Sequence, residues 1–424
     1  MKFRILILGA LIFLLGFLGV LTLSSGFFIL ALPFAVYLGM AIYFSPEEIH
    51  LQVNRQVSAD KVTYGKVVSV DLQVTNLGDF QEELHLQDIA TPTLLIDDGQ
   101  PERVLSLAPG ESAALSYRVS GRRGRYRFKG LKVLARDHSG LFQKEELVPA
   151  QARLVVYPKM TKFKRVTIRP LQTHGFAGPI PSRKPGSGTD FYGVREYQLG
   201  DSLRKINWRV SARQERNFYT NQFEQEGIAD VGLILDARDQ SDIRNTRGSL
   251  FEFGVQAIAS LADAFLSDGH RVALLVYGFG LDRVFPGYGR VQRERILNAL
   301  ARAQTGVNFV LESLERLPTR FFPAKSQLVM VSPLLPDDFQ PLIRLRASGY
   351  EIMVVSPNPI DFEASGISGE QWMPYAIRLA EIERNLLLRK LNRSGIRVVD
   401  WHVDQRLDGI IHATLANRPV RRML

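Results

Sequence analysis

The residues best suited to chemistry lie between Gly186 and Arg213, where glycines separate charged and aromatic side chains. Arginine supplies a planar, permanently charged fork that fits carboxylate or phosphate groups, and Tyr197 and Trp208 add flat apolar faces. The stretch has little apolar periodicity, a composition typical of functional loops. The candidate partner-binding residues are Asp190, Arg195, Glu196, Tyr197, Asp201, Arg204, Trp208 and Arg213.

The same charges also allow a structural interpretation, and the two roles are compatible. The three acidic residues could pair internally with the arginines and pin the segment to a neighbouring sheet. The residues of such a network are Asp190, Glu196, Asp201, Arg195, Arg204 and Arg213. The segment is not a nucleotide-binding P-loop, because no Gly-Lys-Ser/Thr follows its glycines.

A second candidate position is Asp236, which follows the short apolar run Val231–Leu235. Ser332 and Ser356 follow similar runs, so all three lie where ligands bind beyond the carboxyl ends of parallel strands. A strand that ends in Asp resembles the von Willebrand factor A domain, whose first loop reads Asp-x-Ser-x-Ser and holds a divalent ion. Here Arg238 takes a serine position, repels a cation and can neutralise Asp236. We therefore expect Asp236 to cap or to form an ion pair, with no metal and no cofactor; Mg²⁺ at Asp236 is the alternative.

Nothing in the sequence indicates an enzyme. The seven histidines are scattered, no cysteine is present, and His-Glu-x-x-His and Gly-x-Ser-x-Gly are absent. Asp400 and His402 could form a polar pair beside Trp401, which we interpret as structural; a triad assembled from distant residues stays open. The net charge of +10 is spread along the chain without a basic aromatic motif, so we expect no nucleic-acid partner. No small-molecule substrate is indicated.

Two uncharged apolar stretches, Ile5–Leu23 and Phe27–Phe44, begin the chain. Each is close to the ~20 residues that cross a bilayer as a helix, and Ser24–Gly26 supplies turn residues between them. A signal peptide is disfavoured because a second span follows at once. Lys2 and Arg4 favour a cytoplasmic N-terminus. We expect a multi-pass protein of the inner (cytoplasmic) membrane, with a transmembrane hairpin over 1–45 and the bulk of the chain in the cytoplasm.

Residues 46–160 change to the period of two that is typical of strands. Val67–Val74 alternates well, and turn residues recur at short intervals. The stretch Arg122–Phe128 leads through Gly130 into Leu131–Ala135, which we interpret as a hairpin. Many short strands with such turns predict an all-β, immunoglobulin-like sandwich.

Residues 229–424 alternate apolar runs with helical patterns, which predicts an α/β domain with a mainly parallel sheet. The charged, glycine-rich segment 161–228 links this domain to the β-rich one. The expected strands are Val231–Leu235, Val272–Tyr277, Leu328–Val331, Ile352–Val355 and Ile396–Val399. The expected helices are Leu250–Leu266, Val291–Arg302 and Arg378–Leu391.

The segment from Gly186 to Arg213 resembles the signature of the bacterial family called "domain of unknown function 58". Arg123–Tyr126 and Asp137–Phe142 resemble the Arg-Gly-x-Tyr and Asp-x-x-Gly-Leu-Phe patterns of that family, and Gly395–Trp401 resembles its closing strand. His138 departs from the proline often found after that Asp, which bears on a turn.

The resemblance implies a fold that joins a membrane hairpin, a β-sandwich-like region and a von Willebrand A-like domain. It also implies partners, because such proteins are usually encoded near MoxR-type AAA+ ATPases and other von Willebrand A proteins. We therefore expect a membrane-anchored, non-catalytic interaction or scaffold protein that acts with such an ATPase in assembly or maturation of partner proteins. The alternatives are a divalent-ion-dependent adhesion-type domain and an enzyme on lipid-linked or cell-wall substrates.

Overall fold

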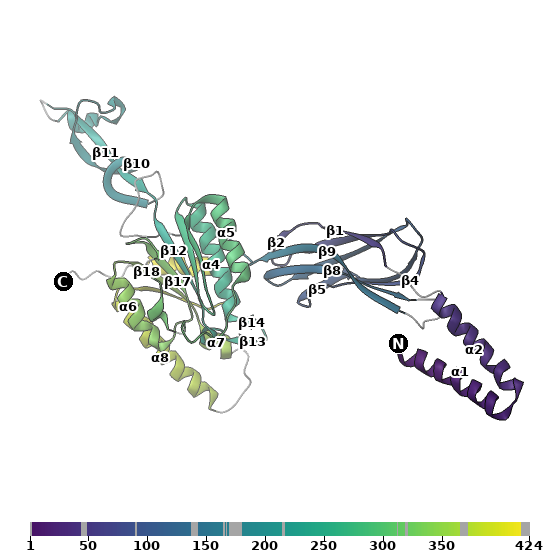
Figure 1. Cartoon of the computed structure of the whole chain (residues 1–424). Coiled ribbons are helices and arrows are strands. Elements are labelled where there is room, and N and C mark those ends of the chain that lie inside the picture. The colour runs from purple at the N-terminus through teal and green to yellow at the C-terminus, as the bar shows by residue number, and fades with distance from the viewer. Residues whose placement is uncertain are drawn as a thin grey trace. The chain divides into compact units, whose positions relative to one another are not determined.

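A computed structural model describes residues 2–43, 49–89, 91–136, 143–163, 166, 168, 180–213, 217–311, 313–318, 321–364 and 372–416. The chain forms two compact units, an N-terminal unit (Met1–Tyr157) and a C-terminal unit (Pro158–Leu424). The motif Asp137–Phe142 lies outside the described residues. Figure 1 traces the chain from its N-terminal helices to its C-terminal α/β sheet.

The chain opens with two apolar helices, α1 (Lys2–Thr22) and α2 (Ser25–Tyr43), as the sequence predicted. Both are long and apolar enough to cross a membrane, and most of their side chains are exposed. The predicted turn at Ser24–Gly26 is wrong in extent, because Ser25 and Gly26 already belong to α2. The chain reverses at Leu23 and Ser24, with Leu23 in the left-handed region (φ 51°). These helices support a membrane anchor.

The rest of the N-terminal unit is a two-layer β structure. One sheet has the order β1-β3-β7-β5 and the other β2-β9-β8-β4-β6. All pairings are antiparallel except β2–β9 among the described strands. The strands are β1 (Leu51–Val57), β2 (Lys61–Thr63), β3 (Val68–Asn76), β4 (Gln81–Asp88), β5 (Leu94–Gly99), β6 (Glu102–Leu107), β7 (Ser112–Gly121), β8 (Gly124–Arg136) and β9 (Gln143–Tyr157).

Alternating side chains from the two sheets form one core between them. Val70 and Leu72 of β3 meet Leu84 of β4 and Val133 of β8, all at most 1% exposed. The period of two that marked this region in the sequence is therefore the alternation between core and solvent.

The predicted hairpin between Arg122 and Ala135 is wrong: β8 runs unbroken through this stretch. Gly130 does not turn the chain but sits at a register shift opposite β9. A Cβ at Gly130 would lie 2.5 Å from the Val148 carbonyl oxygen, so the close approach of the two strands requires glycine there. The reversal lies before β8, at Arg122 and Arg123.

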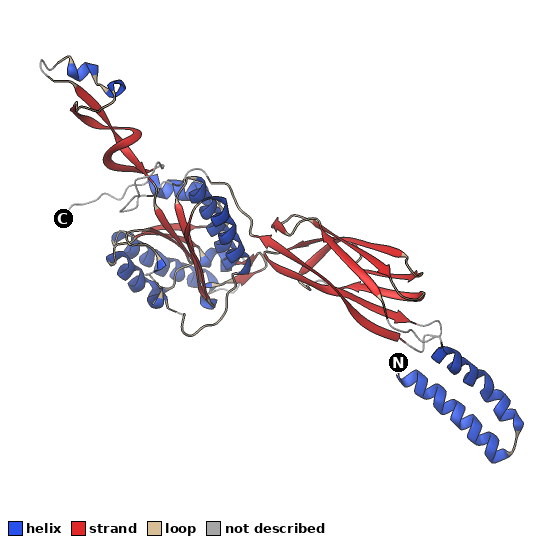
Figure 2. Cartoon of the chain, turned by 45° about the horizontal axis from the view of Figure 1, so that its top comes forward, coloured by secondary structure: helices blue, strands red, loops and turns tan. Residues whose placement is uncertain are grey.

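The C-terminal unit is built on a six-stranded sheet of order β16-β15-β12-β17-β18-β19, with helices around it (Figure 2). Its pairings are parallel except that of β15 with β16. The strands are β12 (Asp230–Ala237), β15 (Arg271–Gly278), β16 (Leu281–Gly287), β17 (Gln327–Val331), β18 (Glu351–Pro357) and β19 (Arg397–Trp401). The helices are α4 (Leu250–Ser267), α5 (Gly289–Arg302), α6 (Phe339–Ala347), α7 (Pro359–Ala364), α8 (Met373–Arg393) and α9 (Leu407–Ala416).

The central strands are apolar because both of their faces are covered. Every residue of β12 and of β17 is buried, as expected for a sheet with helices on both sides. Helix α4 is also apolar enough to span a membrane, yet 67% of it is buried inside the unit. It is therefore a core helix. The antiparallel edge strand β16 was not predicted from the sequence.

The charged segment before the sheet forms a β-hairpin rather than the predicted loop. Strand β10 (Ile180–Glu196) pairs antiparallel with β11 (Tyr219–Gly227), with register shifts along the pairing. Between the two strands lie a 3₁₀ turn (Leu203–Lys205) and the short helix α3 (Trp208–Ser211). Asn207 caps α3 by accepting a hydrogen bond from the Val210 amide at 3.1 Å.

Candidate functional site

The carboxyl end of β12 carries a buried cluster of charges centred on Arg238. The Arg238 guanidinium donates to both oxygens of Asp236, through Nε at 2.9 Å and Nη2 at 2.7 Å. It also donates to both oxygens of Asp338, through Nη1 and Nη2 at 2.8 Å each. The three side chains are at most 3% exposed. One guanidinium thus holds two buried carboxylates in a doubly bidentate arrangement.

Hydroxyl and backbone groups complete this arrangement, which we call the strand-end cluster (Asp236, Arg238, Ser241, Ser332, Asp338). Ser241 and Ser332 donate to Asp236 Oδ2 at 2.8 and 2.7 Å, and the Leu335 amide donates to Asp338 Oδ2 at 2.8 Å. Burial alone lowers the pKa of Arg238, but its hydrogen bonds and charge interactions with the two aspartates outweigh burial and raise that pKa. Arg238 therefore stays charged.

Backbone geometry brings the neighbouring strand close to this cluster. Gly278 ends β15 with φ 152°, and a Cβ there would lie 2.1 Å from the Ala237 carbonyl carbon. Only glycine lets the end of β15 pass beside the residue that precedes Arg238.

The hydrogen bonds and ion pairs of the cluster join the end of β12 to the end of β17 and to the segment that precedes α6. The cation that its carboxylates bind is Arg238, in the place where the alternative interpretation put Mg²⁺. No group of three or more His, Asp or Glu side chains suited to a metal occurs among the residues that the structure describes. Sequence reasoning missed Asp338; its only signal is its place after Pro336 at the start of a helical pattern.

A shallow pocket of about 150 Å³ lies beside Arg238. Its lining residues are Arg238, Asp239, Gln240, Gly278, Gly306, Val307, Asn308 and Leu311. The volume is below the ~300 Å³ at which small-molecule sites begin, and the guanidinium beside it is already engaged by two carboxylates.

A second buried arginine ties together the ends of β17, β18 and β19. Arg384 of α8 donates to the Pro333 carbonyl at 2.9 Å, to Ser356 Oγ at 2.9 Å and to Asp400 Oδ1 at 2.6 Å. The predicted pair between Asp400 and His402 is therefore wrong. Asp400 binds Arg384, and His402 Nδ1 lies against Asp361. The strand-end serines named from the sequence are thus both used inside the fold.

The turn that follows β10 is held by Asp201. Its carboxylate accepts from Arg195 Nη2 at 2.6 Å and from the Gln198 amide at 2.9 Å. Tyr197 donates to the Asp201 carbonyl at 3.1 Å. The hydrogen bond from Gln198 and then the Arg195 guanidinium lower the pKa of Asp201 below its ordinary value of 3.8. Three of the predicted site residues therefore meet in one turn.

The other predicted residues are not drawn into this network. Glu196 accepts from Asn217 at 3.1 Å, while Arg204 and Arg213 are exposed and make no ion pair within the described part of the chain. The side chain of Asp190 lies outside the described residues. Of the six-residue network considered above, the described residues contain the Arg195–Asp201 pair.

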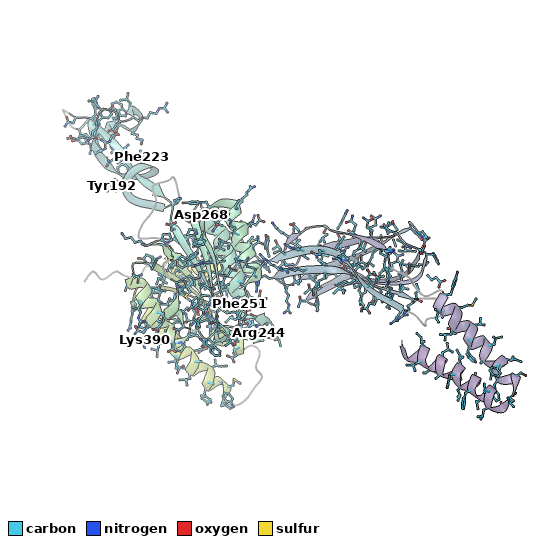
Figure 3. All side chains as sticks on the ribbon, in the orientation of Figure 1. Tyr192, Phe223, Arg244, Phe251, Asp268 and Lys390 are labelled. Carbon is cyan, nitrogen blue, oxygen red and sulfur yellow. The ribbon has the colours of Figure 1, made fainter. Side chains whose placement is uncertain are left out.

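Four exposed apolar residues lie along the chain between β10 and β11, in what we call the hairpin tip (Leu199, Leu203, Trp208 and Phe218). Trp208 and Phe218 meet edge to face, with ring centroids 6.2 Å apart. All four are exposed, by 58% to 103%. Sequence reasoning found Trp208 but missed the other three, because isolated apolar residues in a polar stretch carry no periodic signal. Figure 3 labels Tyr192 and Phe223 on the two strands of this hairpin.

A family model described as "Protein of unknown function DUF58" matches residues 193–363. The matched region contains both the hairpin tip and the strand-end cluster. YeaD, an uncharacterized protein of Bacillus subtilis, is 25% identical over 261 residues, which are 58% of this chain and 60% of the relative. An uncharacterized protein of Mycobacterium tuberculosis is 25% identical over 189 residues, which are 42% of this chain and 58% of the relative. The chain thus spans about three fifths of the length of these relatives.

Two solved structures each align with about a quarter of the chain. The CARDB domain of a Pyrococcus furiosus protein is 20% identical with a TM-score of 0.19, covering 26% of this chain and 91% of that one. A FixG-related protein from Vibrio parahaemolyticus is 15% identical with a TM-score of 0.17, covering 26% of this chain and 98% of that one.

Proposed function

We propose that this chain is a membrane-anchored, non-catalytic interaction protein that docks a partner protein at its hairpin tip. The observation that supports the proposal is that exposed apolar side chains and arginines occur together at the hairpin tip. Leu199 is exposed on the turn that Arg195 and Asp201 hold in place. Leu203 and Trp208 are exposed in the 3₁₀ turn and in α3 that follow, next in sequence to the exposed Arg204 and Arg209. Exposed aromatic and arginine side chains are the types enriched at the centres of protein interfaces.

The rigidity and the charge of the hairpin tip determine what kind of partner surface can bind it. A turn that is already ordered by hydrogen bonds loses little conformational entropy on binding. Arg204 and Arg213 make no ion pair within the described residues, so their charges are available to a partner. The matching surface is an apolar groove with an acidic rim.

We further propose that the partner is a MoxR-type AAA+ ATPase, and that the pair acts in assembly or maturation of other proteins. This rests on the resemblance of the Gly186–Arg213 segment and of Arg123–Tyr126 to a family associated with such ATPases. The anchor would be the α1–α2 hairpin in the inner membrane, with Lys2 and Arg4 favouring a cytoplasmic location for the remainder.

The C-terminal unit would then be a von Willebrand A-like domain that works without a divalent ion. The support is chemical: Arg238 occupies both Asp236 and Asp338 with a fixed internal cation. A domain of this kind would be a rigid platform for the hairpin, and its docking would not respond to chelators.

The test is recovery of partners from native membranes. Tagged full-length protein is extracted in mild detergent, with and without ATP, and bound proteins are identified by mass spectrometry. We expect an AAA+ ATPase in the wild-type sample and a loss of at least about tenfold in the double variant Leu203→Ser, Trp208→Ala. Chelation should change nothing.

The matched control is Phe309→Ala, which removes an 84% exposed aromatic side chain elsewhere in the same unit. Partner recovery should be unchanged in this control. The proposal is wrong if the tip variant, still folded, retains the ATPase, or if the control loses it equally.

A further inference from the structure

Helix α8 has two apolar faces, and only one of them is used inside the C-terminal unit. Leu388 and Leu391 are at most 8% exposed, and Arg384 points into the strand ends that it binds. The second face, which we call the α8 seam, is open to solvent. The seam consists of Tyr375, Leu379, Ile382 and Leu386, which are 78%, 60%, 51% and 52% exposed.

The spacing of the seam is that of a coiled coil. Its residues alternate at intervals of four and three, as the a and d positions of a heptad do. Trp372, 57% exposed, continues the same spacing before the helix begins. In this frame Arg384 and Leu391 are f positions, on the opposite side of the helix. The seam therefore lies on the opposite face of α8 from the buried Arg384 and Leu391.

We propose that the α8 seam pairs, in parallel, with the α8 seam of a second copy of this chain. The charges beside the seam favour a second copy of α8 as the partner and a parallel orientation of the two helices. Arg378 is a g position and Glu383 is the e position of the next heptad. In a parallel pair each g residue meets the following e residue of the other helix, so Arg378 of each copy meets Glu383 of the other.

An antiparallel pair would lose these contacts. There g faces g and e faces e, so in the register that covers the whole seam Arg378 would face Asn385. Within the residues that the structure describes, neither Arg378 nor Glu383 has an ion pair or hydrogen bond of its own. Both are exposed and available to the second copy.

A lipid surface is the competing occupant, and the charges beside the seam disfavour it. Helices that lie on anionic membranes carry basic residues along their polar face. Along the seam the exposed charges are Arg378, Glu381 and Glu383, an acidic balance, and the basic residues Arg389, Lys390 and Arg393 follow after the seam ends. The seam is short for a free coiled coil. However, α8 is already folded, and two copies anchored in one membrane meet at a high effective concentration.

Cysteine cross-linking of the full-length chain in native membranes tests the proposal, because the natural sequence contains no cysteine. Single variants Leu379→Cys, Ile382→Cys and Leu386→Cys should each form a disulfide-linked dimer on mild oxidation, since a parallel pair brings each a or d residue against itself. The matched control is Glu381→Cys, an exposed position off the seam, which should stay monomeric under the same conditions.

Charge reversal then tests the predicted orientation. Arg378→Glu and Glu383→Arg should each lower cross-linking of Ile382→Cys several-fold, and the two reversals together should restore it. Three results would overturn the proposal: no cross-link at any seam position in folded, inserted protein; equal cross-linking at Glu381→Cys; or cross-linking of Leu379→Cys only with Ile382→Cys, the mark of an antiparallel pair. Binding of vesicles through the seam without cross-linking would assign it to lipid instead. None of these readouts depends on docking at the hairpin tip.

Discussion

Two arginine–aspartate pairs of the C-terminal unit have almost the same length and opposite surroundings. Arg238 meets Asp236 at 2.7 Å with both side chains at most 3% exposed, while Arg195 meets Asp201 at 2.6 Å with side chains 32% and 20% exposed. The first pair shares its guanidinium with another buried carboxylate. The second closes a turn whose neighbours Leu199 and Leu203 are open to solvent.

The difference shows that the geometry of an ion pair does not reveal its role, whereas its surroundings do. Charges removed from water must be fully satisfied, so breaking a buried pair strands a charge that nothing else compensates. A partly exposed pair can exchange its partner for water at little cost. The strand-end cluster is therefore expected to serve the fold, and the turn held by Asp201 to serve what binds beside it.

The largest expected effect comes from breaking the buried pair. Arg238→Ala would leave Asp236 and Asp338 together without a cation, and should lower the free energy of unfolding by about 3–5 kcal/mol near neutral pH. Burial raises the pKa of Asp338, and the Arg238 guanidinium that opposes this rise would be gone, so the loss should shrink as the pH falls and Asp338 takes up a proton. Urea unfolding followed by tryptophan fluorescence measures this, because all three tryptophans lie in the C-terminal unit.

The control is an exposed pair of an arginine and a carboxylate in the same unit. Arg344 meets Glu315 at 2.9 Å with side chains 68% and 52% exposed, so Arg344→Ala should cost no more than about 1 kcal/mol. If Arg238→Ala proved as mild as this control, burial would not separate the two kinds of pair.

Removing apolar side chains from the hairpin tip should change the stability of the fold only slightly. Leu199→Ser and Leu203→Ser change side chains that are 103% and 68% exposed, so each should alter the free energy of unfolding by about 0.5 kcal/mol or less. The same urea titration measures it. A loss above about 2 kcal/mol would mean that the hairpin tip packs as core, and the comparison with the strand-end cluster would collapse.

The sequence predicted elements whose signal is local. The buried strand β12 and the helix α4 were foreseen because a run of apolar residues, or apolar residues at helical spacing, reports burial directly. Strand β10 was not foreseen, because its glycines and charges match no strand pattern and its partner β11 lies beyond the turn. The long strand β8 was misread because Gly130 resembles a turn residue, whereas the close approach of β9 requires it.

The sequence indicated several residues of the candidate site but few of the contacts between them. That Arg238 could neutralise Asp236 follows from two neighbouring positions, but Asp338 is far along the chain and reaches the cluster only through the order of strands. Helix α8 shows the same limit. Its apolar positions are plain in the sequence, yet only the packing of Leu388 and Leu391 shows which face remains open.

The smallest effect should come from titrating the exposed pair. Because the pKa of Asp201 is lowered in the folded chain, the order that it gives to the turn is present above its ordinary pKa of 3.8 and is lost as the pH falls through the lower folded value. Hydrogen-exchange protection of the Gln198 amide, corrected for intrinsic rates, should therefore be steady near neutral pH and decrease as the pH falls below 3.8. In Asp201→Asn this protection should already be low at neutral pH and should not vary over the same range of pH. Global unfolding should change little, because the pair is partly exposed. Protection that is equally strong and equally pH-independent in both proteins would show that backbone geometry, not the Arg195–Asp201 pair, orders the turn beneath the hairpin tip.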